Sequence, residues 1–423
     1  MILNSFKYSV RSFIRDMIRG VPARLLIYPR LKRNERSNEA LRNYLQRGGA
    51  HFSARPDVLG IVDDVSSCID KEVVRKEPQR FIVGRSLTTL LRNKIKTSGS
   101  TGRPLVLVQD IWAVIKEEAF VYRQLRWAGY RHGERRVWLR GDIVARGADK
   151  RQTYGCRDWW SNTLMLSSYH ISSETARSYI ESMRKFDPVL IQAYPSSISA
   201  LASWLIASGM KFDSTKLKAI VTSSETLTGE MKDRIEEAFG CRVFDWYGHA
   251  ERLVAIGTCE QGGRHVLSDY GRTELIPMDD GRYELVGTGY NNRAMPLTRY
   301  RTGDFVTLDG KRCTCGCIFP TVSRVLGRND KVVTLSDGRM LGRLDHVFKG
   351  VPDVVEGQVV YKGDNRFVLK VVAGPEWSRT GVEQLIKNMK SRVDGVTVEV
   401  EEVDAIPRKA NGKFEFVLIE ETT

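Results

Sequence analysis

Residues 96–104 of this chain read Lys-Thr-Ser-Gly-Ser-Thr-Gly-Arg-Pro. Two glycines and four hydroxyl side chains fall between Thr97 and Gly102, and an apolar run at 105–108 follows. Glycines let backbone N–H groups turn inward and hydroxyl groups add donors, so such a loop can hold a polyphosphate. It is not a Walker A element, because no Lys-Ser/Thr pair closes it. A Ser/Gly-rich surface turn is the alternative interpretation of this segment taken alone.

Outward from this loop, between residues 95 and 325, short apolar runs alternate with helical patterns. The runs at 136–139, 189–191, 218–221 and 243–244 are expected to be strands, and 197–207 and 229–239 helices. This alternation is typical of a parallel, doubly wound sheet with helices. The segment 264–310 instead has short runs separated by Gly/Asp turns, which predicts an antiparallel part.

The pattern changes again after Gly327. Strand-like runs at 354–361, 367–372 and 396–400, with a helical pattern at 381–393, predict a small α+β unit. We therefore predict an α/β protein with a large domain at 1–327 and a small one at 328–423. Residues 1–90 of the large domain are expected to be mostly helical and basic.

The composition excludes several classes of protein. The chain has 423 residues, 42% of them hydrophobic, which is enough for two or three domains with a real core. No run approaches the roughly eighteen apolar residues of a membrane span, and no apolar signal peptide begins the chain, so a cytoplasmic protein is expected. Seven cysteines, an odd number and mostly scattered, argue against a disulfide framework.

The formal charge of +15 is partly concentrated in residues 1–36, which carry nine basic residues against Asp16 and Glu35. Apolar and basic residues recur there at helical spacing: Phe6, Val10, Phe13, Ile14 and Met17, beside Lys7, Arg11, Arg15 and Arg19. This pattern predicts a basic amphipathic helix. One hypothesis is peripheral contact with the anionic inner face of a membrane. The alternative is that the apolar stripe packs on the protein and the basic face is solvated. Nucleic-acid binding is not expected, because no recognition module is visible.

Four later segments follow the loop in a fixed order. They are Asp-Trp-Tyr-Gly-His-Ala-Glu at 245–251, Arg-Tyr-Arg-Thr-Gly-Asp at 299–304, Gly-Arg-Asn-Asp-Lys at 327–331 and Pro-Arg-Lys-Ala-Asn-Gly-Lys at 407–413. With the loop, this series resembles the core motifs of the adenylate-forming superfamily, which includes acyl- and aryl-CoA synthetases. The phenylacetate-CoA ligase branch and its CapK-type capsule-biosynthesis relatives are most similar. The grounds are the short chain, the loop ending Gly-Arg-Pro without a following Lys, and Cys-Thr-Cys-Gly at 313–316.

The resemblance implies ATP and Mg²⁺ as cofactors, a large adenylate-forming domain and a small mobile lid domain. It assigns Mg²⁺ to Glu251, both ribose hydroxyls to Asp304, and the α-phosphate and substrate carboxylate to Lys413; Glu251 and Lys413 would be the catalytic residues. The implied nucleotide-binding residues are Thr97, Ser98, Gly99, Ser100, Thr101, Gly102, Ser224, Glu225, Tyr247, Gly248, Asp304 and Arg328.

Further roles follow from the same resemblance. Asp330 and Lys331 would form the hinge of the small domain, and Tyr194, Pro195 and His249 would border the acyl pocket. Structural alternatives remain for several assignments: a surface glutamate at 251, an ordinary hairpin turn at 302–304 and a solvated terminal lysine at 413.

The soft metal ligands of the chain cluster in two places, Cys259-x5-His265 and Cys313-Thr-Cys-Gly-Cys317. Thiolate and imidazole suit tetrahedral zinc. The resemblance assigns the site to Cys259, His265, Cys313 and Cys315, but the choice among the three late cysteines stays open. Reduced structural thiols are the alternative.

The function expected from these features is an ATP-dependent ligase that converts a small carboxylic acid to an acyl-adenylate and releases pyrophosphate. The acyl group would then pass to a thiol, either CoA or a carrier, or to an amine. The CapK-type resemblance connects such a reaction to surface polysaccharide biosynthesis. The alternative is a non-catalytic, membrane-associated assembly factor that retains the fold.

Overall fold

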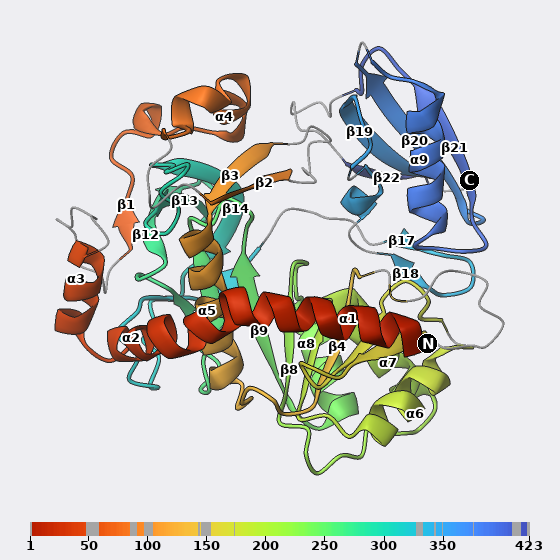
Figure 1. The fold of residues 1–423 in the computed structure, drawn as a ribbon, viewed down its shortest axis with the longest axis horizontal. Coiled ribbons are helices and arrows are strands. Elements are labelled where there is room, and N and C mark those ends of the chain that lie inside the picture. Colours follow the sequence, from red (N-terminus) through yellow and green to blue (C-terminus); the bar gives the residue numbers. More distant parts are fainter. Residues whose placement is uncertain are drawn as a thin grey trace.

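The computed structural model describes residues 2–47, 59–84, 91–96, 105–142, 144, 154–172, 174–326, 333–341, 344–348, 350–374, 376–407 and 416–420. Figure 1 shows a large body of sheets and helices and, at its upper right, a smaller unit that contains strands β19 to β22 and helix α9. Parallel and antiparallel strands both occur, so the predicted mixed α/β class is confirmed. Within the described ranges, no helix has the length and apolar character needed to cross a bilayer.

Helices predominate in the described part of residues 1–90. They are α1 (Ile2–Arg15), α2 (Tyr28–Asn34), α3 (Asn38–Arg47) and α4 (Lys71–Lys76), with π-helical turns at Asp16–Gly20 and Ala23–Ile27 and 3₁₀ turns at Val65–Ser67 and Pro78–Phe81. The short strand β1 (Gly60–Ile61) joins the segment to a sheet by pairing with β12 (Gly271–Pro277).

A nine-stranded sheet forms the centre of the body, in the order β15-β11-β10-β9-β8-β7-β4-β6-β5. Its strands are β4 (Arg136–Arg140), β5 (Gly155–Asp158), β6 (Thr163–Ser167), β7 (Leu190–Ala193), β8 (Ala219–Ser223), β9 (Arg242–Gly248), β10 (Ala255–Thr258), β11 (Arg264–Val266) and β15 (Thr321–Val322). The five neighbours from β9 to β6 run parallel. Every residue of β7 and β8 is buried, as expected for parallel strands covered on both faces.

Helices α6 (Ala176–Phe186), α7 (Pro195–Ala207) and α8 (Gly229–Phe239) connect these parallel strands and build the main core with them. The opposite face of β4 lies under α1, since Tyr8 and Ser12 line one cavity with Arg136 and Trp138.

A second, five-stranded sheet has the order β1-β12-β13-β14-β16 and is antiparallel from β12 to β16. Its remaining strands are β13 (Tyr283–Gly289), β14 (Tyr300–Thr307) and β16 (Arg324–Val325).

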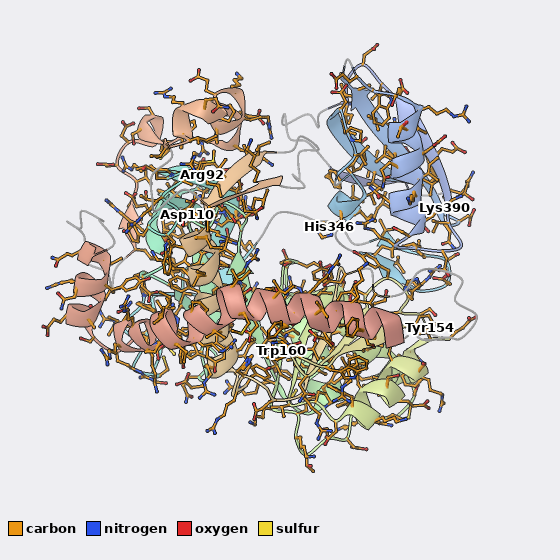
Figure 2. The ribbon with its side chains drawn as sticks, in the orientation of Figure 1. Arg92, Asp110, Tyr154, Trp160, His346 and Lys390 are labelled. Carbon is orange, nitrogen blue, oxygen red and sulfur yellow. The ribbon has the colours of Figure 1, made fainter. Side chains whose placement is uncertain are left out.

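The antiparallel pair β2 (Arg92–Lys96) and β3 (Val106–Asp110) flanks the hydroxyl-rich loop. Lys96 pairs with Val106, so the two described ends of that loop lie side by side. Helix α5 (Ile111–Trp127) begins directly after β3. Figure 2 shows Asp110 at this junction, where its Oδ1 accepts a hydrogen bond from the backbone N–H of Ala113 at 2.8 Å and caps the helix.

The small unit has a four-stranded sheet in the order β21-β20-β19-β22. Its elements are β17 (Val333–Thr334), β18 (Met340–Leu341), a 3₁₀ turn at Leu344–Phe348, β19 (Val354–Tyr361), β20 (Arg366–Ala373), α9 (Arg379–Lys390), β21 (Thr397–Glu402) and β22 (Val417–Ile419). One apolar cluster, formed by residues between Val333 and Val417, fills this unit. The domain boundary at 327/328 stays a prediction, because residues 327–332 lie outside the described ranges.

A buried ion pair ties the N-terminal helices to the body. Arg123 of α5 donates to both carboxylate oxygens of Asp269, at 2.8 and 2.9 Å. Their side chains are 1% and 0% exposed. The amide of Asn34, at the end of α2, also donates to Asp269, at 3.1 Å. Charges this deep in a protein must be paired, so the contact fixes the position of α2 on the body.

Candidate functional site

The described candidate residues gather where the parallel strands of the nine-stranded sheet end. Arg140 ends β4, Tyr194 follows β7, Ser224 follows β8 and Tyr247 lies one residue before the end of β9. In open α/β sheets, ligands bind beyond the carboxyl ends of the strands. This edge is therefore the candidate active site.

Tyr247 and Asp304, two of the predicted nucleotide-binding residues, contact each other directly. The hydroxyl group of Tyr247 donates to Oδ2 of Asp304 at 2.8 Å. Because Tyr247 belongs to β9 and Asp304 to β14, the contact joins the nine-stranded sheet to the five-stranded sheet. Asp304 is 6% exposed. A carboxylate held in this way keeps a fixed orientation.

The Thr302-Gly303-Asp304 segment is not a hairpin turn, so that alternative is wrong. It lies inside β14, where the pairing with β13 shifts its register. Gly303 has φ of +70°, which favours glycine. The hydroxyl group of Thr302 donates to the carbonyl of Leu285 at 2.8 Å and accepts from the N–H of Asp304 at 3.1 Å. The irregular strand therefore directs the Asp304 carboxylate.

Glu251 contacts Tyr300 and His249 and is 8% exposed. Its Oε1 accepts a hydrogen bond from the hydroxyl group of Tyr300 at 3.1 Å, and its Oε2 lies 3.0 Å from Nδ1 of His249. The N–H of Val254 donates to Nε2 of His249 at 3.1 Å, so the ring proton resides on Nδ1 and points at Glu251. Carboxylate oxygen is the type of ligand that Mg²⁺ prefers, so the residue type at Glu251 fits the predicted role.

This arrangement gives His249 a positioning role in the described structure. Both ring nitrogens are engaged with the protein, one with Glu251 and one with the backbone of Val254. Its side chain is 9% exposed. The assignment of His249 to the acyl pocket stays a prediction.

Ser224 and Glu225 directly follow β8, and both make polar contacts with other segments. Ser224 has φ of +73°, and its hydroxyl oxygen accepts a hydrogen bond from Nη2 of Arg140 at 2.6 Å. Glu225 accepts from the N–H of Ser196, in the first turn of α7, at 3.0 Å. A carboxylate at the start of a helix accepts a hydrogen bond from an N–H group that has no partner within the helix. It also interacts favourably with the positive end of the helix dipole. The two predicted residues therefore fix the strand ends relative to α7.

Arg140 was not predicted from the sequence. Its guanidinium lies 5.0 Å from the centre of the Trp138 ring and 5.3 Å from that of Tyr194. It is separated from Ser224 by 84 positions, so no local motif connects the two. The alternation Arg136, Trp138, Arg140 along one strand is the signal that could have identified this face.

Tyr194 and Pro195 lie at the junction of β7 and α7, and Tyr194 is buried. A Cβ atom at Gly141 would lie 2.6 Å from the hydroxyl oxygen of Tyr194 and 2.9 Å from that of Tyr169. Gly141 directly follows β4, and any larger residue there would force these tyrosine hydroxyl groups to shift.

Several candidate residues lie outside the described ranges. These are Thr97, Ser98, Gly99, Ser100, Thr101, Gly102, Arg328, Asp330, Lys331 and Lys413. Their roles stay predictions. Among the described candidates, the structure joins Tyr247 to Asp304 and holds Glu251 through Tyr300 of the same strand as Asp304, with Gly248 at the exposed end of β9.

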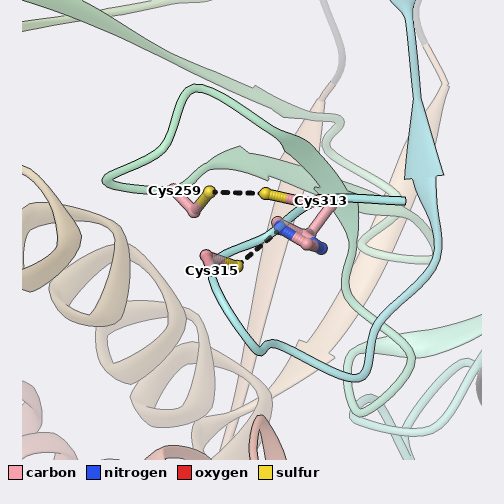
Figure 3. Close-up of side chains that lie close together, drawn as sticks. Cys259, Cys313 and Cys315 are labelled. Carbon is pink, nitrogen blue, oxygen red and sulfur yellow. Dashed lines mark hydrogen bonds between the residues drawn. The ribbon is translucent and has the colours of Figure 1, made fainter. Parts of the chain in front are cut away.

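The predicted zinc ligands meet in one place. The ligand atoms of Cys259, His265, Cys313 and Cys315 all lie within 4.8 Å of one another. Figure 3 shows the facing sulfur atoms of Cys259 and Cys313, 3.5 Å apart, with Sγ of Cys315 3.3 Å from Nε2 of His265. Zn–S bonds of about 2.3 Å in a tetrahedron put two sulfurs roughly 3.8 Å apart. The spacing and the donor set therefore fit zinc.

Two further contacts support this fit. Nδ1 of His265 lies 2.9 Å from the carbonyl oxygen of Phe319, which accepts its proton and leaves the Nε2 lone pair facing the thiols. A Cβ atom at Gly263 would lie 2.6 Å from Sγ of Cys313, so a glycine is needed for this approach. Cys317 is not in the group and packs against an apolar cluster instead. The geometry thus selects Cys313 and Cys315 among the late cysteines.

Comparison with known proteins gave concordant matches. A family profile described as the CapK C-terminal domain matches residues 333–420. Protein CapK of Staphylococcus aureus is 26% identical over 382 residues, covering 87% of this chain and 80% of CapK. A phenylacetate-coenzyme A ligase of Pseudomonas putida is 28% identical over 280 residues, 62% of this chain and 58% of the ligase. One of Thermus thermophilus is 26% identical over 208 residues, and the match spans 46% of each.

Solved structures give weaker similarity. A 2-hydroxyisobutyryl-CoA ligase in complex with 2-HIB-AMP and CoA is 18% identical, with a TM-score of 0.49, and the match covers 93% of this chain and 89% of that one.

Proposed function

Because the chain is homologous to protein CapK and to the phenylacetate-CoA ligases, we propose that it is an AMP-forming carboxylate ligase. The observation that carries this proposal is the hydrogen bond from Tyr247 of β9 to Asp304 of β14, with Glu251, just after β9, accepting a hydrogen bond from Tyr300 of the same strand β14. Tyr247 and Asp304 come from two different sheets, and the resemblance assigns both to the nucleotide and Glu251 to Mg²⁺.

The proposed reaction has two steps. A carboxylate is a poor acyl donor, because its leaving group would be oxide. Attack of one carboxylate oxygen on the α-phosphorus of ATP forms a mixed anhydride, the acyl-adenylate, and pyrophosphate leaves. A nucleophile then attacks the acyl carbon and AMP leaves. The nucleophile is a thiol of CoA or a carrier, or an amine.

Each described residue has a defined task in this proposal. The Asp304 carboxylate accepts hydrogen bonds from the ribose hydroxyls, while Tyr247 fixes its orientation. Glu251, held by Tyr300 and His249, would hold Mg²⁺ through oxygen. When bound, that ion neutralises charge on the triphosphate.

The product's destination is the finer part of the proposal. Similarity to CapK over most of the chain favours a small organic or amino acid destined for a surface polysaccharide. A non-catalytic assembly factor is the rival function, and the presence of Glu251, Asp304 and Lys413 argues against it.

The decisive experiment is a carboxylate-dependent pyrophosphate-exchange screen over aryl, acyl and amino acids. Radioactive pyrophosphate should enter ATP only when an accepted acid is present. Mass spectrometry of the product formed with CoA or with an amine then identifies the acceptor. If no acid in a broad panel supports exchange, and no acyl-AMP is found in the protein, the non-catalytic factor would be favoured.

Asp304→Ala is expected to lower kcat/KM for ATP by roughly a hundredfold, about 3 kcal/mol, because two hydrogen bonds from the ribose hydroxyls to a charged carboxylate are lost. The wild type should also discriminate against 2′-deoxy-ATP, and the variant should not. Tyr247→Phe is the matched control: it keeps the ring and the carboxylate, and we expect a loss of about tenfold. Undiminished discrimination in Asp304→Ala would contradict the ribose assignment.

We also propose that Cys259, His265, Cys313 and Cys315 hold a structural zinc ion. Protein purified under reducing conditions should contain about one zinc per chain by elemental analysis, in keeping with one four-ligand site. Cys259→Ser should lose the metal and at least about 2 kcal/mol of unfolding free energy, since zinc binding contributes to folding. Cys317→Ala, which lies outside the ligand group, should retain the metal. Metal-free wild-type protein that takes up no added zinc would refute the site.

A further inference from the structure

Helix α1 turns its small polar side chains toward the protein. Ser5 and Ser12 are buried, at 3% and 4% exposure. The hydroxyl oxygen of Ser5 accepts a hydrogen bond from the N–H of Arg157 at 3.1 Å, and that of Ser9 accepts from the N–H of Trp159 at 2.8 Å. These bonds attach the serine face of α1 to edge strand β5 and the turn after it.

Eight large apolar side chains between residues 6 and 26 are largely exposed, whereas Ile27 is buried in an apolar cluster of the body. The eight side chains are between 40% and 69% exposed: Phe6, Val10, Phe13, Ile14, Met17, Ile18, Leu25 and Leu26. The alternative in which this stripe packs on the body is therefore wrong. A surface helix normally buries its apolar stripe, and here the hydrogen-bonding serines take that position. An exposed apolar surface of this kind marks an interaction site.

A positively charged flank runs beside the apolar stripe. Lys7, Arg11 and Arg15 are exposed and lie four residues apart, on one side of the helix. The two acids of residues 1–36 do not offset this charge at the surface. Asp16 binds Arg24 through two hydrogen bonds of 2.6 and 3.0 Å, and Glu35 is buried.

Two exposed tryptophans extend the apolar surface. Trp159 and Trp160 are 49% and 45% exposed. The ring of Phe13 meets that of Trp160 edge-on, with centres 4.6 Å apart, and Figure 2 shows Trp160 beside the helix. Tryptophan is enriched where proteins meet the boundary between lipid and water.

We propose that residues 2–27 form an interfacial anchor that lies in the surface of an anionic lipid bilayer. The apolar stripe enters the boundary between headgroups and acyl chains, and the basic flank contacts anionic headgroups. Charge decides between a bilayer and a second copy of this chain as the occupant. Two such flanks would repel each other, whereas an anionic bilayer complements them. The proposal does not depend on the ligase reaction.

Vesicle co-sedimentation of the full chain tests the apolar contribution. The protein should bind phosphatidylglycerol-containing vesicles at least about tenfold better than phosphatidylcholine vesicles. Ile14→Ser with Ile18→Ser should lower binding to the anionic vesicles at least about tenfold, since two buried aliphatic side chains are lost. The matched control replaces two exposed apolar residues elsewhere, Met278→Ser with Leu308→Ser, and should change binding less than about twofold.

Charge substitutions test the basic flank. Lys7→Gln with Arg11→Gln and Arg15→Gln should weaken binding to anionic vesicles roughly a hundredfold, at about fivefold per charge, and molar salt should weaken wild-type binding likewise. Far-UV circular dichroism and thermal unfolding verify that each variant is folded.

Two results would overturn the proposal. One is equal binding by the wild type and the folded isoleucine variant. The other is no vesicle binding, together with a concentration-dependent dimer in sedimentation velocity that the isoleucine substitutions abolish. The second result would assign this face to contact between copies of the chain.

Discussion

Lys413→Ala is expected to lower carboxylate-dependent pyrophosphate exchange by about a hundred- to a thousandfold, the effect of removing one group that stabilises transition-state charge. In the attack of the carboxylate on ATP, two anionic groups approach each other. An ammonium group between the substrate carboxylate and the α-phosphate would lower that barrier. Asn411-Gly412 precedes the lysine and is a typical tight-turn dipeptide. Lys413 lies outside the described residues, so its role is predicted from the sequence and the resemblance.

The second half-reaction provides the internal control. Lys413→Ala should still transfer the acyl group from preformed acyl-adenylate to a thiol or amine, because that step needs no attack on phosphorus. Lys409→Ala removes the same charge four residues earlier and should retain exchange within about threefold. Full exchange activity in Lys413→Ala would show that the assignment is wrong.

Arg123→Met is expected to lower the free energy of unfolding by about 4 kcal/mol, the typical effect of leaving one buried charge without its partner. Arg123 and Asn34 are the donors to Asp269 described above. In the variant, only the Asn34 amide of these two would remain. The loss should appear in urea unfolding of the full chain as a lower midpoint.

Two companion variants make this result interpretable. Adding Asp269→Asn to Arg123→Met should restore part of the stability, since no uncompensated charge remains. Arg379→Met removes the same type of residue from an exposed pair with Glu383, with side chains 92% and 68% exposed, and should change stability by less than about 1 kcal/mol. A similarly small change in Arg123→Met would mean that the buried pair does not stabilise the fold.

Regular elements with strong local patterns were predictable from the sequence. The helix expected at 229–239 is α8, and the strand expected at 354–361 is β19. The alternation of runs also predicted the parallel strands β4, β7 and β8. Each depends on side chains that are near one another along the chain, so periodicity reveals it.

Part of the candidate site was also predictable, from motif order and from the resemblance to a known family. The motif order identified Tyr247, Glu251 and Asp304, and the resemblance named the four metal ligands. The sequence could not exclude Cys317 as a zinc ligand, because Cys313, Cys315 and Cys317 follow one another at intervals of only two residues. The fold excludes it by packing Cys317 against apolar residues while Cys313 and Cys315 face Cys259 and His265.

Several features required contacts between distant parts of the chain. Arg140 donates a hydrogen bond to Ser224, which lies 84 positions later in the chain. Strand β22 pairs in parallel with β19, although β20, α9 and β21 lie between them in the sequence. Gly303 reads as a turn residue, and its place inside β14 depends on the partner strand β13.

Residues 1–36 illustrate the division most clearly. Their sequence established that a helix with an apolar stripe and a basic flank would form, because spacing and charge are local properties. Which face meets the protein depended on hydrogen bonds from residues 157 and 159, about 150 positions away, to the serines of α1. Local order follows from neighbouring side chains, whereas burial is decided by the partners that folding brings into contact.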